Sequence, residues 1–97
     1  MELYFYVCME CGSLSWYENS NCNDCYELTK NGKIKYLGDN IKEAISDIYC
    51  FCLDCDSDDL ERFDLKDYTK EEINKLIKMS EEDRIGWAKK QKIIRGL

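Results

Sequence analysis

The sequence contains no histidine and no proline, and it has no long run of apolar residues. Without histidine, the chain cannot form the Cys-His or Ser-His pairs of nucleophilic catalysis or a metal site with imidazole ligands. Its longest apolar stretches are interrupted by Lys, Asp or Glu, so none reaches the ~20 residues that span a bilayer. These absences predict a soluble protein that is not an enzyme and has no contact with a membrane.

The amino terminus also lacks the features of a secretory signal. Residues 1–6 (Met-Glu-Leu-Tyr-Phe-Tyr) contain neither a basic segment nor a sufficient apolar stretch. Disulfides need an oxidising compartment, and without a secretory signal the chain is not expected to reach one. We therefore expect it in the cytoplasm, or in the host cytoplasm if it is viral. Eleven lysines against three arginines suit an A/T-rich bacterium or its phage, and a phage or mobile element is therefore an expected source.

Cysteine, in contrast, is abundant. Six of the seven cysteines form three Cys-x-x-Cys pairs, which are Cys8/Cys11, Cys22/Cys25 and Cys52/Cys55. This spacing lets one tight turn present two thiolates to a metal ion, and two such turns complete the tetrahedron that zinc prefers. A core of this size is marginal by itself, so we expect one zinc ion per chain to support the fold.

The first two pairs are the preferred ligands, namely Cys8, Cys11, Cys22 and Cys25. Ten residues separate the two pairs, Tyr6-Val7 precedes the first pair, and Gly12 follows it. In these features residues 4–26 resemble the zinc-ribbon and rubredoxin-like class of metal-binding proteins. The resemblance implies a four-cysteine site, structural with zinc or, in the rubredoxin-like alternative, an electron carrier with iron.

An internal repeat suggests a rival set of ligands. Residues 7–13 (Val-Cys-Met-Glu-Cys-Gly-Ser) and 51–57 (Phe-Cys-Leu-Asp-Cys-Asp-Ser) share the pattern apolar-Cys-apolar-acid-Cys-x-Ser. Two similar knuckles can form one pseudo-symmetric site, which would use Cys8, Cys11, Cys52 and Cys55. Residues 12–50 would then be an insertion between the knuckles.

Three cysteines remain under either pairing. They could bind a second zinc ion together with a carboxylate such as Asp54 or Asp56. Alternatively, bridging sulfurs could join the two zinc ions in one cluster. Cys50, the unpaired seventh, is expected to be a small buried side chain without a role at the metal.

The first half of the chain reads as β-structure. The aromatic residues of 3–7 predict a strand that leads into the first knuckle, and residues 13–18 are expected to be its return strand. Asn31-Gly32 tolerates positive φ at both positions, so it predicts a hairpin that joins 26–30 to 33–37.

Helical signals follow. Asn40 predicts the start of a short helix over 41–48, Thr69 with Glu72 forms a capping box, and Ser80 offers a further helix cap. The sequence thus predicts an α+β fold, with a short helix and a C-terminal helical pair after the hairpins. The zinc-binding β-rich region is expected over residues 1–66, and a helical segment over 67–97 is expected to pack on it within one domain.

Charge is unevenly spread. The formal net charge is −6, residues 88–97 carry four basic and no acidic side chains, and the other 87 residues therefore sum to −10. Six acids lie within residues 54–64 beside the last knuckle. Such a segment can steer a basic partner, so the expected partner-binding residues are Asp58, Asp59, Glu61 and, on the C-terminal helices, Trp87.

The pattern as a whole predicts a non-catalytic, regulatory zinc protein that docks on a larger protein as an adaptor or inhibitor. One alternative is a nucleic-acid-associated zinc ribbon that uses the basic residues of 89–95, although residues 1–29 contain no Lys or Arg. Another is an acidic mimic of nucleic acid that uses residues 54–64.

Overall fold

The structure is a computed structural model, and it describes residues 3–19, 23–39 and 50–94. The elements of these segments, in chain order, are β1 (Tyr4–Cys8), β2 (Ser15–Asn19), β3 (Asn23–Thr29), the 3₁₀ turn η1 (Lys30–Gly32), β4 (Lys33–Asp39), β5 (Cys50–Cys52), β6 (Leu60–Asp64), the 3₁₀ turn η2 (Leu65–Asp67), α1 (Lys70–Lys78) and α2 (Glu81–Ile94). None of the described helices is both long enough and apolar enough to cross a membrane.

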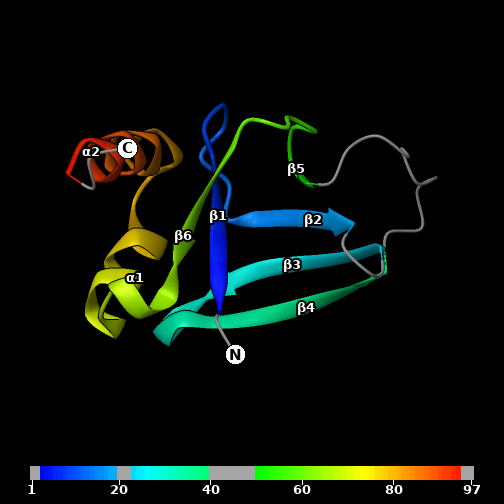
Figure 1. The fold of residues 1–97 in the computed structure, drawn as a ribbon, viewed down its shortest axis with the longest axis horizontal. Helices are drawn as coiled ribbons and strands as arrows, with labels where there is room; N and C mark the ends of the chain where they lie inside the picture. The colour runs from blue at the N-terminus through cyan, green and yellow to red at the C-terminus, as the bar shows by residue number, and fades with distance from the viewer. Residues whose placement is uncertain (1–2, 20–22, 40–49, 95–97) are drawn as a thin grey trace.

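The strands form two antiparallel sheets. One pairs β1 with β6, and the other has the order β4-β3-β2-β5. Figure 1 shows β1 and β6 running across the direction of β2, β3 and β4. The helices α1 and α2 lie on the other side of β6 from these three strands. Antiparallel hairpins followed by helices confirm the predicted α+β class.

The pairing of β1 corrects one sequence prediction. Strands are present near 3–7 and 13–18, but β2 pairs with β3 and β5 and is not the return strand of β1. β1 pairs instead with β6, placing Tyr4 opposite Asp64 and Cys8 opposite Leu60. The turn after Cys8, with Gly12 at φ +76°, leads the chain into the other sheet, and the distant β6 supplies the partner strand of β1.

The other local predictions are confirmed where the structure describes them. Asn31 and Gly32 both have positive φ, and they join β3 to β4. At the start of α1 the backbone N–H of Glu72 donates to Thr69 Oγ1, while Thr69 N–H donates to the Glu72 carboxylate. Asp83 N–H donates to Ser80 Oγ before α2. The predicted helix over 41–48 lies outside the described residues.

The main apolar core connects both sheets with both helices. It is built from side chains of β1, β2, β3, β6, α1 and α2 and of the turn before β2: Phe5, Val7, Leu14, Trp16, Leu28, Phe63, Ile73, Leu76 and Ala88. Phe5 and Phe63 face each other across the β1–β6 pair with ring centroids 5.6 Å apart. Burial of each valine, leucine, isoleucine or phenylalanine among them stabilises the fold by roughly 1.5–3 kcal/mol. The expected boundary at residue 66 stays a prediction.

A buried carboxylate joins the two sheets. Glu18 on β2 accepts hydrogen bonds from the Tyr4 hydroxyl on β1, at 2.8 Å, and from Trp16 Nε1, at 2.9 Å. Burial, and then this bond to Glu18, raise the pKa of Tyr4 to about 12, so Tyr4 stays a donor at neutral pH. A buried carboxylate without donors would destabilise the fold, so the bond from Tyr4 favours the close approach of β1 to β2, while the Trp16 bond, within β2, holds the Glu18 side chain in place.

Arg84 ties the helices to the turn after β1. Its guanidinium donates to the carbonyls of Leu76 (3.1 Å) and Ile77 (2.6 Å) at the end of α1, and to the carbonyl of Gly12 (3.3 Å). The last carbonyls of a helix have no partner within it, so one side chain satisfies two of them and anchors α2 against the turn.

Replacing Arg84 with Lys should therefore lower the free energy of unfolding by about 2 kcal/mol, because one ammonium cannot donate to three separate carbonyls. Urea unfolding of the metal-loaded protein, followed by circular dichroism, measures the change. The matched control is Arg62→Lys, because half of the Arg62 side chain is exposed, its ion pair with Asp64 is 3.7 Å long, and a lysine can also lie over the Tyr4 ring that Arg62 covers. The control should change stability by less than about 0.5 kcal/mol; equal losses in the two variants would contradict the anchoring role.

Candidate metal centre

The segment after β1, residues 8–13 (knuckle 1), is a tight turn closed by its own backbone. Cys8 N–H donates to the Ser13 carbonyl at 3.0 Å, and Gly12 N–H donates to the Cys8 carbonyl at 2.8 Å. The amide of Cys11 also points at the sulfur of Cys8, 3.4 Å away. Gly12 occupies the left-handed position that this turn requires.

Residues 52–57 (knuckle 2) repeat the same construction after β5. Cys52 N–H donates to the Ser57 carbonyl at 2.8 Å, Asp56 N–H donates to the Cys52 carbonyl at 3.0 Å, and the amide of Asp54 points at the Cys52 sulfur. Asp56 has φ +60° at the position equivalent to Gly12. The repeat seen in the sequence is thus a structural repeat.

Reciprocal hydrogen bonds hold the two knuckles to each other. Met9 N–H donates to the Asp59 carbonyl at 2.8 Å, and the equivalent Leu53 N–H donates to the Ser15 carbonyl at 3.3 Å. The buried Ser13 hydroxyl adds a third link by donating to the carboxylate of Asp54. These bonds give the pair of knuckles an approximate two-fold relation and fix their separation.

Four sulfurs meet between the knuckles. The Sγ atoms of Cys8, Cys11, Cys52 and Cys55 all lie within 4.8 Å of one another. The pairs Cys8/Cys55 and Cys11/Cys52 are each 3.5 Å apart. These distances exceed the ~2.05 Å of a disulfide and bracket the ~3.8 Å edge of a tetrahedron with metal–sulfur bonds of ~2.3 Å. The group can therefore hold a metal ion.

The protein environment prepares one sulfur for ionisation. Burial opposes a charge on Cys8, but the N–H groups of Cys11 and Glu10 and the thiols of Cys55 and Cys11 donate to its sulfur, so its pKa is lowered. Burial raises the pKa of Cys11, its partner in the same knuckle. Only a thiolate binds a metal well, so a bound cation would replace the protons that the four sulfurs otherwise share.

Exposure differs between the knuckles. Cys8 and Cys52 are fully buried, Cys11 is half-buried, and Cys55 is exposed. Knuckle 1 lies under the start of α2: a Cβ on Gly12 would lie 2.7 Å from the Glu81 carbonyl carbon. Solvent therefore reaches the sulfur group from the side of knuckle 2.

The preferred ligand set from the sequence is not the set that the described residues bring together. Cys25 packs against Tyr17 and Phe51 in a separate small apolar cluster, and Cys22 lies outside the described residues. β2 pairs Tyr17 with Cys25 and Trp16 with Cys52, and paired residues share one face of a sheet while neighbours face opposite ways. Cys25 and Cys52 therefore lie on opposite faces, and the rival set has the geometry of a site.

The remaining described cysteine also lies apart from the group. Cys50 is half-buried, interacts with the Tyr6 hydroxyl, and has a pKa that burial raises. In residues 3–19, 23–39 and 50–94, no second cluster of metal ligands accompanies the four sulfurs. Asp56 stays exposed and Asp54 is engaged by Ser13.

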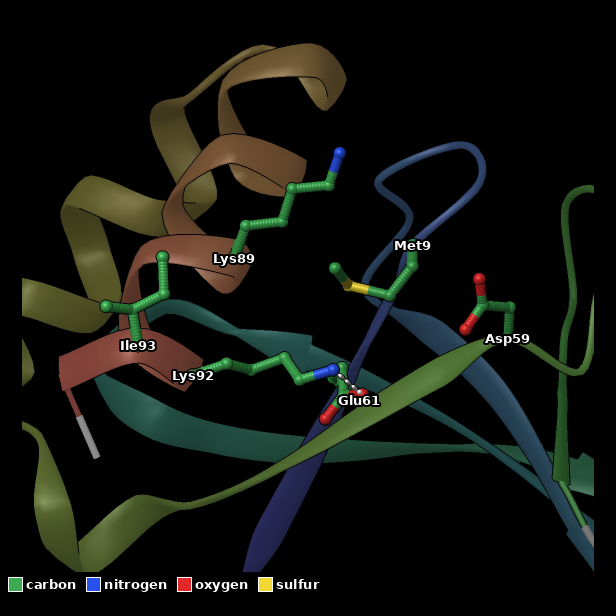
Figure 2. Close-up of a pocket in the computed structure, with 6 residues that line it drawn as sticks. All are labelled: Met9, Asp59, Glu61, Lys89, Lys92 and Ile93. Carbon is green, nitrogen blue, oxygen red and sulfur yellow. Dashed lines mark ion pairs between the residues drawn. The ribbon is translucent and has the colours of Figure 1, made fainter. Parts of the chain in front are cut away.

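The residues expected to bind a partner divide into two groups. Asp58 and Asp59 are exposed just after knuckle 2, as an interaction surface would require. Glu61 instead pairs with Lys92 on α2 at 2.9 Å (Figure 2). The Trp87 ring packs onto the core, with its centroid 5.1 Å from that of Phe63, so much of its area is used within the protein.

Sequence reasoning did not single out Ser13 or Arg84, although each contacts a knuckle. The sequence could have pointed to Ser13, because the repeat places a serine two positions after the second cysteine of both knuckles. It could not have pointed to Arg84, because its three carbonyl partners come together only in the tertiary structure.

The chain matches no protein-family model, no curated protein and no solved structure in these comparisons. The fold and the site by themselves define its class. It is a small α+β protein in which two Cys-x-x-Cys knuckles form a candidate metal centre.

Cys52→Ser should weaken zinc binding at least about tenfold, because it removes one of four converging sulfurs. Cys25→Ser should retain zinc, since Cys25 lies on the opposite face of the sheet. Elemental analysis after dialysis against a weak chelator, together with a competitive zinc titration, measures both. The reverse result, with zinc lost from Cys25→Ser or Cys22→Ser and kept by Cys52→Ser, would restore the first pairing.

The equivalent positions Gly12 and Asp56 should respond to substitution with opposite signs. Gly12→Ala should lower the free energy of unfolding by roughly 2–4 kcal/mol, because the new methyl group meets the backbone of Glu81 and φ is positive. Asp56→Gly should raise it by up to about 1 kcal/mol, because glycine relieves the left-handed strain. Chemical denaturation at fixed zinc concentration reports both, and a harmless Gly12→Ala would show that α2 does not cover knuckle 1.

Proposed function

We propose that the protein is a non-catalytic zinc-binding module that docks on a larger protein as an adaptor or inhibitor. The observation that carries the proposal is the convergence of four cysteine sulfurs from two closed knuckles. Four thiolates occupy every position of a tetrahedral ion, whereas a catalytic zinc keeps one position open for water or substrate. A metal held in this way stabilises the fold, and the function of the protein is then to bind another molecule.

Zinc is the proposed ion because four-cysteine tetrahedral sites are typical of structural zinc. Iron in the same ligand set is the second candidate, and it would make the protein an electron carrier. The two differ in a simple observable, because a ferric tetrathiolate centre is coloured and reversibly reducible while zinc is neither.

The charge of the loaded protein favours a basic partner. Four thiolates and one Zn²⁺ change the formal charge from −6 to −6 − 4 + 2 = −8. Asp56 and Asp58 are exposed on and beside knuckle 2, where the backbone is fixed by the bonds of Cys52 and Asp56. Acids on a fixed backbone lose little entropy on docking, and they steer a basic surface from a distance.

The contacts of α2 give less support to the nucleic-acid alternative. Lys92, one of the basic residues that would contact phosphate, is paired with Glu61, and its pKa is raised first by that hydrogen bond and then by the charges of Glu61 and Asp59. Part of the basic segment thus compensates acids of the same chain. A protein partner accounts for the exposed acids without requiring that this ion pair break.

The test is capture of a partner from a lysate of the source organism by tagged, zinc-loaded protein. We expect about one zinc per chain, an interaction that is lost on chelation, and association that is slower by about tenfold in Asp56→Asn/Asp58→Asn. The control is Glu71→Gln/Glu82→Gln, which removes the same charge from the exposed starts of α1 and α2. Surface plasmon resonance at low salt compares the association rates.

Three results would count against the proposal. Equal slowing by both double variants would mean that only net charge matters. Capture of nucleic acid without protein would favour the zinc-ribbon alternative, and a coloured, reducible iron preparation would favour the electron carrier.

A further inference from the structure

A cavity of ≈ 550 Å³ lies between knuckle 1, β6 and the last turns of α2. Figure 2 shows the side chains around it, which are Met9, Asp59, Glu61, Lys89, Lys92 and Ile93. Its size is within the range of binding sites. The site described above does not use this cavity, although Met9 belongs to knuckle 1.

Two acidic and two basic side chains line the cavity, and one of each forms an ion pair. Lys92 and Glu61 form an ion pair at one edge of the cavity, at 2.9 Å. In the part of the chain that the structure describes, neither the ammonium of Lys89 nor the carboxylate of Asp59 has an ion-pair partner. Figure 2 shows Lys89 and Asp59 on opposite sides of Met9. Among the described residues, the rim therefore offers one charge of each sign that is not in an ion pair, although Lys92 offsets part of the charge of Asp59.

Two apolar side chains, Met9 and Ile93, line the same cavity. Ile93 is 79% exposed, although an isoleucine side chain gains roughly 1.5–3 kcal/mol from burial. Met9 packs with one side against the core, and the flexible thioether adapts well to a contacting side chain. Isolated exposed apolar residues are common, but this one borders a cavity that a second apolar side chain, Met9, also lines.

We propose that this cavity is the interface of a homodimer and that its occupant is Ile93 of a second copy of the chain. A two-fold axis near Ile93 would bring the two isoleucines together and place Lys89 of each copy opposite Asp59 of the other. A strongly basic partner would leave Lys89 facing like charge, and a strongly acidic one would do the same to Asp59. A patch with one unpaired charge of each sign is complementary to itself, and this association goes beyond the proposed docking on a larger protein.

The experiment is sedimentation velocity of the zinc-loaded full chain over a concentration series at physiological salt, where repulsion between two acidic bodies is screened. We expect a monomer–dimer equilibrium. Ile93→Asp should weaken it at least about tenfold, whereas Ile94→Asp should not, because Ile94 is also exposed (65%) but borders a different pocket with Asp67, Tyr68 and Gln91. Circular dichroism and zinc content verify that both variants are folded.

A charge exchange tests the pairing itself. Asp59→Lys and Lys89→Asp change the net charge in opposite directions, so weakening of the dimer by both single variants cannot come from net charge. The double variant should restore association to within a few-fold of the original chain, because the ions are exchanged and not removed. A chain that stays monomeric at every concentration reached, or dimerises equally well with Ile93→Asp, would overturn the proposal. Neither result bears on zinc binding or partner capture, so the proposed function is tested separately.

Discussion

The structure depends on one constraint, which is that two knuckles far apart in the chain must face each other at a fixed distance. Cys8 and Cys55 are 47 residues apart in sequence, yet their sulfurs are 3.5 Å apart. The β1–β6 pairing and the reciprocal bonds from Met9 and Leu53 bring about this approach. Four sulfurs crowded together without a cation repel as thiolates and are poor hydrogen-bond partners as thiols, so a metal ion bound here would stabilise the contact between the two sheets.

The two knuckles have the same backbone conformation but different surroundings. Gly12 lets the start of α2 lie directly on knuckle 1, and Arg84 fastens that contact to the end of α1. Knuckle 2 has an aspartate at the equivalent position and leaves Cys55 exposed. The helices therefore cover one half of the site, while the other half remains open to solvent. If the proposed docking takes place, the exposed knuckle 2 is the half of the site that a partner can reach.

Charge follows the same division. The acids of residues 54–59 lie on the knuckle that faces solvent, whereas Glu61 on β6 is paired with Lys92 of α2. The basic residues from Lys89 to Lys92 lie in the last turns of α2, as the favourable placement of lysines at a helix C-terminus predicts, and Lys92 reaches the acidic strand β6. Lys92 at the end of α2 is favoured by the helix dipole, and it also pairs with Glu61 on β6. This ion pair helps to hold α2 against β6.

The sequence by itself determined the features whose physics is local. The turn at Asn31-Gly32, the caps at Thr69 and Ser80, the α+β class and the Cys-x-x-Cys turns all depend on residues within a few positions of one another. Which two of the three cysteine pairs meet, and which strand lies beside β1, were decided only by the tertiary structure. The alternation of side chains along β2, β3 and β5 sends Cys25 and Cys52 to opposite faces of one sheet, and sequence spacing cannot show this before the register is known. The repeat around the outer pairs was the one sequence signal of the arrangement, because two halves of a pseudo-symmetric site need the same turn.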